Sequence, residues 1–240
     1  MRTSLAAAAA LTLASSACLA GMGLRGSGKM KSERREVPPF DALVVESGIR
    51  VTVSIGPQKP LELSGEDNIL QILVTKVEDG RLRIGFPHQT NIWSHQDVQV
   101  NLTVPKLREV DASGGAEVRG QLASVDALRL DSSGGSQLHL TGIDTPELTL
   151  DGSGGAEIEL AGKADRFSLE MSGGSQVHAS NLSVHSMHVS GSGGSQGEVR
   201  VSEKIKGDLS GGSSLEVIGK ASTRVATSGG SSVDYGDSDD

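Results

Sequence analysis

The sequence predicts an all-β fold, a parallel β-solenoid of the right-handed β-helix type with about 18–20 residues per coil. First, a Ser-Gly-Gly motif recurs seven times between residues 113 and 230, at steps of 18 to 20 residues. Second, apolar and polar residues alternate on both sides of each motif, which is typical of strands with one buried face. Third, aromatic residues make up only 2% of the chain, and stacked aliphatic side chains can fill a solenoid without aromatic bulk.

Each repeat predicts a strand before and a strand after the glycines, and a looser third apolar position that suggests a third short face. The positions after the glycines form two inward columns, namely Val118, Leu138, Ile158, Val177, Gly197, Leu215 and Val233, then Gly120, Leu140, Leu160, Ala179, Val199, Val217 and Tyr235. The column before them is Val110, Leu130, Leu150, Leu169, Val189, Gly207 and Val225. The third column is Leu122, Ile143, Leu182, Val201 and Ile218.

The glycines are expected to form the corners between faces, because glycine adopts positive φ without steric cost and serine can bond the local backbone. Repeating one corner should stack glycine on glycine in coils about 4.8 Å apart. A phosphate cradle is the rival interpretation of a glycine-rich loop. It is disfavoured because neither a Lys-Ser/Thr pair nor a helix start follows the glycines.

Residues 1–20 predict a secretory signal peptide, with Arg2 before a short apolar core and small residues after it. Cys18, the single cysteine, stands where a bacterial lipoprotein carries its acylated cysteine. Two outcomes stay open: lipidation of Cys18, which would anchor the protein to a membrane, or removal of Cys18 by cleavage after Ala20. Residues 21–36 are expected to be a flexible tether.

The rest of the chain divides into three parts. Residues 37–110 have strand signals without Ser-Gly-Gly and predict irregular N-terminal coils and a cap, with an excursion loop at residues 88–96 that contains Trp93. Residues 111–236 predict the regular coils, and residues 237–240 an acidic tail. Exposed strand edges invite pairing, and the acidic end of the chain, residues 234–240, should discourage it.

Several segments resemble a known family, the putative auto-transporter adhesin, head GIN domain family. They are residues 26–28, 35–37, 40–45, 48–53 and 79–84, followed by Asp-Ala-Ser-Gly-Gly and Asp-Gly-Ser-Gly-Gly repeats. The resemblance covers roughly residues 36–235 and implies a bacterial, exported, often lipidated protein with a β-solenoid-like fold. The family has no established catalytic residues, so the resemblance implies none here.

An acidic column is the strongest candidate site. Asp111, Asp131 and Asp151 stand two residues before successive Ser-Gly-Gly serines, and Glu170 and Asp208 continue the column. Stacked carboxylates would raise one another's pKa or attract a cation such as calcium. The favoured interpretation is structural, with each Asp capping its own turn, and no metal or cofactor is expected.

Outward polar columns provide further candidate contact positions, namely Gln137, Gln176, Gln196, His139 and His178. His139 and His178 would lie two coils apart with Glu159 between them, too far apart to share a metal. Mixed-charge pairing between neighbouring strands is expected instead.

The leading functional hypothesis is a non-enzymatic protein of the periplasm or outer cell surface that offers a rigid surface for adhesion, scaffolding or partner binding. Its partner would be an envelope protein or a glycan, and self-association is a further option. The alternative is a carbohydrate-active enzyme similar to polysaccharide lyases, which would need acids and basic residues converging in a groove. A net charge of −8 disfavours nucleic acid as a partner.

Overall fold

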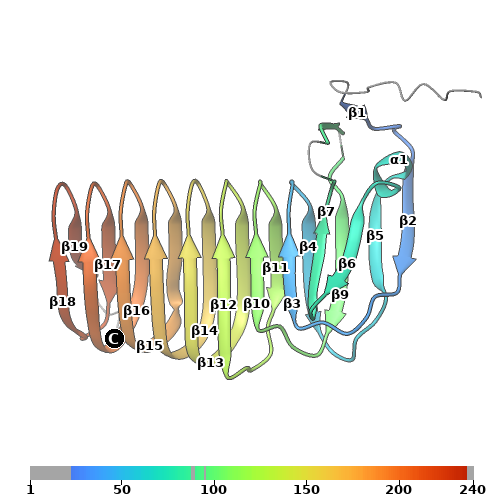
Figure 1. Cartoon of the computed structure of the whole chain (residues 1–240). Coiled ribbons are helices and arrows are strands. Elements are labelled where there is room, and N and C mark those ends of the chain that lie inside the picture. Colours follow the sequence, from blue (N-terminus) through green and yellow to red (C-terminus); the bar gives the residue numbers. More distant parts are fainter. Residues whose placement is uncertain (1–22, 88–89, 95, 237–240) are drawn as a thin grey trace, which may run out of the picture.

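The computed structural model describes residues 23–87, 90–94 and 96–236, and the predicted signal peptide, Cys18 and the acidic tail at residues 237–240 lie outside them. The chain forms a parallel β-solenoid, as the sequence predicts, in which two layers of strands lie side by side along one axis (Figure 1). Each coil passes up one layer, turns at a Ser-Gly-Gly corner, and runs down the other layer.

We name the two layers by one strand of each, the β12 face and the β11 face. Strands β13 to β16 run through the lower bend without a break and contribute to both. The β12 face contains β3 (Ala42–Val45), β10 (Glu109–Ala112), β12 (Ala127–Ser132), the second halves of β13 (Gln137–Gly152), β14 (Glu157–Met171), β15 (Gln176–Gly191) and β16 (Gln196–Leu209), and β18 (Ser222–Thr227). The β11 face contains β4 (Arg50–Ile55), β11 (Glu117–Gln121), the first halves of β13 to β16, β17 (Ser214–Ile218) and β19 (Ser232–Gly236).

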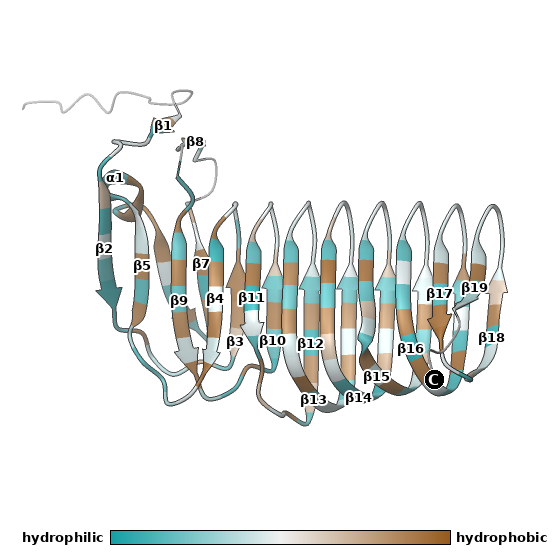
Figure 2. Cartoon of the chain, turned by 180° about the vertical axis from the view of Figure 1, so that it is seen from behind, coloured by the Kyte–Doolittle hydropathy of each residue, from teal (hydrophilic) through white to brown (hydrophobic). Residues whose placement is uncertain are grey.

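The interior is lined by superimposed aliphatic side chains. Val110 pairs in register with Leu130, and Leu130 with Leu150, and all three are completely buried. Figure 2 shows the resulting alternation of apolar and polar bands along the strands. The third apolar column is buried except at Ile218, which is half-buried, but Ile143 and Leu182 lie within continuous strands at the lower bend rather than on separate strands. The expected third face is therefore a bend.

The corners stack as the sequence predicts. Gly154 has φ +69°, and the N–H of Gly174 in the next coil donates to the Gly154 carbonyl oxygen at 2.6 Å. The serine after the glycines is buried in several coils, as Ser136, Ser175 and Ser213 show. Each donates its hydroxyl to a backbone carbonyl of its own or a neighbouring coil, so the corner interior has no unsatisfied side chain.

The coil order departs from the chain order at the N-terminal end. Strand β3 pairs with β10 on one side and with β7 (Arg81–Gly85) on the other, and β4 lies between β11 and β9 (Gln99–Val104). The β3–β4 coil is thus inserted between two later segments. Ser47 and Gly48 form its corner with φ values of 64° and 68°, and Gly114 stacks directly on Ser47.

An antiparallel cap closes this end. Strand β2 (Met30–Arg35) pairs with β5 (Leu61–Glu66), β5 with β9, and β6 (Val74–Glu78) with β7, while α1 (Asp67–Leu70) follows β5. Above the cap, β1 (Leu24–Arg25) pairs with β8 (Ile92–Trp93) of the excursion loop. Residues 30–35 therefore differ from the expected flexible tether, because the alternating MKSERR segment adds a strand to β5.

The last coil also differs from the expectation at one position. Tyr235 pairs in register with the buried Val217, as an inward residue should. Its side chain is nevertheless 63% exposed, because no further described coil lies beyond β19 to cover it.

Candidate functional site

The outer surface of the β12 face brings the predicted acidic column together. The strand register places Asp111 beside Asp131 and Asp131 beside Asp151, all facing outward near the Ser-Gly-Gly corners. This placement follows from the period-two alternation: the residues directly before and after each Asp point inward, so the Asp itself points outward.

Arg129 binds the column from the neighbouring outward row. Its Nε and Nη2 donate to the two carboxylate oxygens of Asp131 at 2.9 and 2.8 Å, and Nη2 also reaches Asp151 Oδ2 at 2.6 Å. The expected Asx caps are not found among the hydrogen bonds of the described residues. Two residues before the corner, each Asp is still on its strand and points outward, so it is poorly placed to cap the turn.

Partial burial leaves these carboxyls electrostatically strained. Desolvation raises the pKa of Asp111, and the charges of Asp131 and Glu109 add to that rise. Desolvation likewise raises the pKa of Asp131 against the opposing effect of Arg129. The three aspartates and Arg129 line a shallow depression of about 460 Å³, together with Arg81 and Ser153. Acids and arginines therefore converge here, which the sequence alone did not reveal.

The predicted histidine and glutamine positions lie on the opposite, β11 face. Gln137 and Gln176 flank Glu157, and Gln196 follows Gln176 in the same outward row. The next row alternates acids and histidines: His139 Nδ1 lies 3.0 Å from Glu159 Oε2, and His178 Nδ1 lies 3.7 Å from Glu198 Oε2.

These five positions therefore form two polar rows separate from the acidic column, and they stay predicted contact positions. Cross-strand pairing of a histidine with a carboxylate, as expected, accounts for these contacts. In the part of the chain that the structure describes, no cluster of three or more His, Cys, Asp or Glu side chains could hold a metal ion.

Sequence reasoning missed a basic patch on the C-terminal half of the β12 face. We define the basic patch as Arg166, His188, Lys204, Lys206 and Arg224. The register places His188 beside Lys206 and Lys206 beside Arg224, while Lys204 is two residues from Lys206 on the same strand. All five residues are exposed. The repeat alignment could have revealed this patch, because the five positions fall in two neighbouring outward rows.

The basic patch is largely free of internal neutralisation. Among the described residues, Lys204, Lys206 and Arg224 make no ion pair, and Arg166 approaches Glu147 only at 3.9 Å. Arg166, His188, Lys204 and Lys206 line a depression of about 370 Å³. Three cationic groups and the His188 imidazole can therefore contact one bound anionic molecule.

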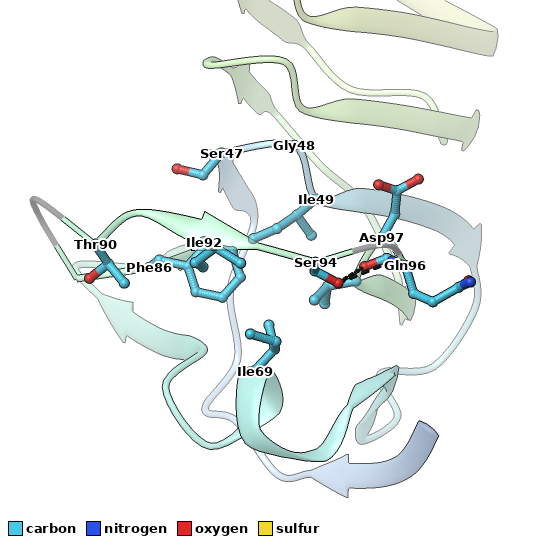
Figure 3. A pocket seen from close by; sticks show the side chains of 11 residues that line it. Ser47, Gly48, Ile49, Ile69, Phe86, Thr90, Ile92, Ser94, Gln96 and Asp97 are labelled. Atoms are coloured by element: carbon cyan, nitrogen blue, oxygen red, sulfur yellow. Dashed lines mark hydrogen bonds between the residues drawn. The ribbon is translucent and has the colours of Figure 1, made fainter. Parts of the chain in front are cut away.

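A separate cavity of about 270 Å³ lies in the cap, between α1 and the first corner (Figure 3). Ile49, Ile69 and Phe86 point into it, and Ser94 and Asp97 lie at its polar side. Ser94 Oγ accepts the Gln96 N–H at 3.1 Å, which ties these two residues of the excursion loop together.

The fold and these surfaces define a class of protein: a capped repeat protein that offers long, flat polar faces. The chain belongs to the family described as putative auto-transporter adhesin, head GIN domain, whose profile matches residues 39–221. The resemblance inferred from the residues is thereby confirmed, and membership implies an exported or surface protein. In the described part of the chain, no helix has the length and apolar character of a membrane span.

Solved structures with the same fold include a putative adhesin from Bacteroides fragilis, with a TM-score of 0.81 at 19% identity over 90% of this chain and 100% of that one. A putative lipid binding protein from Parabacteroides distasonis matches with a TM-score of 0.69 at 16% identity, over 90% and 100% of the two chains. A putative adhesin from Parabacteroides merdae matches with a TM-score of 0.64 at 18% identity, over 89% and 99%. Among the curated proteins, none matches this chain.

Proposed function

We propose that this chain is a non-enzymatic adhesion or scaffolding protein of the cell envelope, and that it binds an anionic polysaccharide along the β12 face. The observation that carries the proposal is the basic patch: five exposed cationic or ionisable side chains on neighbouring coils, three of them without ion pairs among the described residues. The family's description as adhesins supports a binding role.

The spacing of the basic patch favours a polymer over a small anion. His188, Lys206 and Arg224 form one row along the solenoid axis, in which neighbouring strands lie about 4.8 Å apart. A polysaccharide with evenly spaced carboxylate, phosphate or sulfate groups can place one group opposite each coil. A rigid face also loses little conformational entropy on binding, which preserves affinity.

The proposal places the protein at the periplasmic or outer surface of a bacterial membrane. The signal peptide predicted from residues 1–20 supports export, and acylation of Cys18 would tether the solenoid to the membrane. Mass spectrometry of the mature N-terminus tests this part separately. A diacylglyceryl cysteine supports the anchor, and an unmodified chain that begins at Gly21 contradicts it.

The binding test compares charge reversal inside and outside the basic patch. Titration of polygalacturonate into the mature protein should give saturable binding that weakens as salt rises, because exposed charges are screened. The Lys204→Glu/Lys206→Glu variant should lose this binding. The matched control is Lys59→Glu/Lys106→Glu, which makes the same charge change at two exposed positions outside the patch.

Equal loss in both variants would show that net charge alone governs the interaction, and the proposed site would then be wrong. Binding of a neutral polysaccharide with equal affinity would also contradict the proposal. Circular dichroism of both variants checks that the solenoid is intact.

A second candidate function is a polysaccharide lyase-like enzyme. The convergence of Asp111, Asp131 and Asp151 with Arg129 favours it, since lyases need acids and basic groups in one groove, and the raised pKa of Asp111 suits a proton-transferring group. Ultraviolet absorbance of new double bonds after incubation with polyuronates measures the reaction. Turnover that disappears in Asp111→Asn or Asp131→Asn would establish the enzyme and displace the adhesion proposal.

A further inference from the structure

The two ends of the solenoid are built differently. Strands β2, β5 and β6 of the cap, which pair antiparallel, lie at the N-terminal end. At the other end, within the described residues, β18 pairs only with β16 and β19 only with β17. One side of each terminal strand therefore presents backbone N–H and C=O groups without a strand partner, which is a template for pairing with another chain.

The side chains of the last coil suit a contact with another protein chain. The interior columns end at Val225 and Val233, which are only half-buried, and at the exposed Tyr235. Between Ser222 and Gly236 the only charged residues are Arg224 and Asp234. Strands β18 and β19 thus combine an uncovered apolar interior with one positive and one negative side chain, one on each face.

We propose that a second copy of this chain covers this end, forming a twofold dimer in which β18 of one protomer pairs antiparallel with β19 of its partner. A twofold axis parallel to the strands produces this arrangement, because it exchanges the two faces and keeps the corners at the same level. The inference rests on the end of the solenoid and shares one residue, Arg224, with the basic patch of the polysaccharide proposal.

Counting from the corner fixes the register of this dimer. Arg224 lies four residues before Ser228, and Asp234 lies four residues after Gly230, so both are at the same level and face outward. Arg224 of one protomer then faces Asp234 of the other, twice by symmetry. By the same count Val225 meets Val233 and Thr223 meets Tyr235, which closes the apolar interior across the junction.

The charges also select this geometry over the other twofold arrangement. An axis perpendicular to the faces would pair β18 with β18 and β19 with β19. That arrangement would place the two Arg224 side chains on one face and the two Asp234 side chains on the other, and like charges on paired strands destabilise a sheet. The proposal departs from the expectation that the acidic end discourages edge pairing: Asp234 has an opposite charge to face in this dimer, and residues 237–240 lie outside the described residues. The twofold axis makes the two junctions between β18 and the partner's β19 identical. The other end of each protomer is closed by its cap, so the assembly stops at a dimer.

A charge swap tests the dimer and its register. Analytical ultracentrifugation of the mature protein should show a monomer–dimer equilibrium. Arg224→Asp and Asp234→Arg should each raise the dimer dissociation constant about tenfold or more by creating like-charge pairs. The double variant Arg224→Asp/Asp234→Arg should restore the dimer. Monomeric wild-type protein at all concentrations overturns the proposal, and single variants that dimerise like the wild type overturn the register. Circular dichroism confirms that each variant is folded.

Discussion

Arg129 joins two successive coils through Asp131 and Asp151, with its Nη2 atom 2.8 Å from Asp131 Oδ1 and 2.6 Å from Asp151 Oδ2. This guanidinium partly neutralises a column of carboxylates that the repeat otherwise stacks at close range. Asp111, at the end of the same column, has no such bond within the described residues, so burial and the neighbouring carboxylates raise its pKa without an arginine to oppose them at hydrogen-bond distance.

The first prediction concerns the pH dependence that follows from Asp111. Its pKa in the folded protein is raised above the ordinary 3.8, so the folded state binds more protons than the unfolded state between those values. Its stabilising contribution is present below the ordinary pKa and is lost as the pH rises through the raised value. Asp111→Asn should therefore increase the free energy of unfolding at pH 7 relative to wild type, and the difference should shrink towards pH 3.

Urea unfolding at both pH values measures this difference. Asp208→Asn, an exposed position in the same row, controls for the loss of one negative charge from the surface. A gain at pH 7 that is equal in both variants would show that general charge reduction, and not the burial of Asp111, is responsible.

A second prediction separates the two glycines of one corner. Gly154 has φ +69°, and a Cβ there would lie 3.0 Å from the Gly134 nitrogen. A Cβ on Gly155 would meet no atom within 4 Å. Gly154→Ala should cost about 2 kcal/mol because L-residues are disfavoured in the left-handed region, whereas Gly155→Ala should change stability by less than about 0.5 kcal/mol. Thermal unfolding measures both, and equal costs would refute the role assigned to the first glycine.

A third prediction concerns the interior stack. Phe167 is 1% exposed and pairs in register with Leu148 and Met187. Phe167→Ala should destabilise the protein by about 3–5 kcal/mol through lost burial and a cavity. The neighbouring exposed Arg166→Ala serves as the control and should have little effect on chemical denaturation. A small effect at Phe167 would mean that adjacent coils can close the gap.

The fourth prediction concerns the cap. Glu66 is 3% exposed, accepts the Gly28 N–H at 2.6 Å and is hydrogen-bonded by the Ser94 hydroxyl. Glu66→Ala removes the Ser94 contact and leaves the Gly28 N–H without its acceptor, and it should cost about 1–3 kcal/mol. Hydrogen exchange should accelerate in residues 24–35. Glu78→Ala, exposed on strand β6 of the cap and paired with Lys76 of its own strand, should leave this exchange unchanged, and unchanged exchange in both variants would contradict the locking role of Glu66.

The repeat allowed most of the regular coils to be predicted, because period two and a fixed corner together determine which side chains stack. Val110, Leu130 and Leu150 superimpose for that reason. The Ser47-Gly48 pair is itself a turn signal between two strands, but the insertion of β3 between β7 and β10 is a long-range pairing that no local pattern encodes.

The candidate sites were less predictable than the fold. The acidic column was visible as a repeat position, but its Arg129 clamp depends on a side chain in the adjacent row. The basic patch combines residues from two rows whose register shifts between coils, as between Val184 and Ser186 where β15 pairs with β16. Small shifts of this kind change which charges become neighbours.

Because strands β3 and β4 are inserted next to the cap, the coils can assemble in order from the N-terminal end. Residues 30–104 contain the cap strands together with β3, β4, β7 and β9, so this segment can assemble before any Ser-Gly-Gly repeat has emerged from the export machinery. Its free edge, formed by β3 and β4, is the surface on which β10 and β11 pair. Each later coil then finds a ready template in the one before it, and we expect the solenoid to lengthen stepwise from the N-terminal end during translocation.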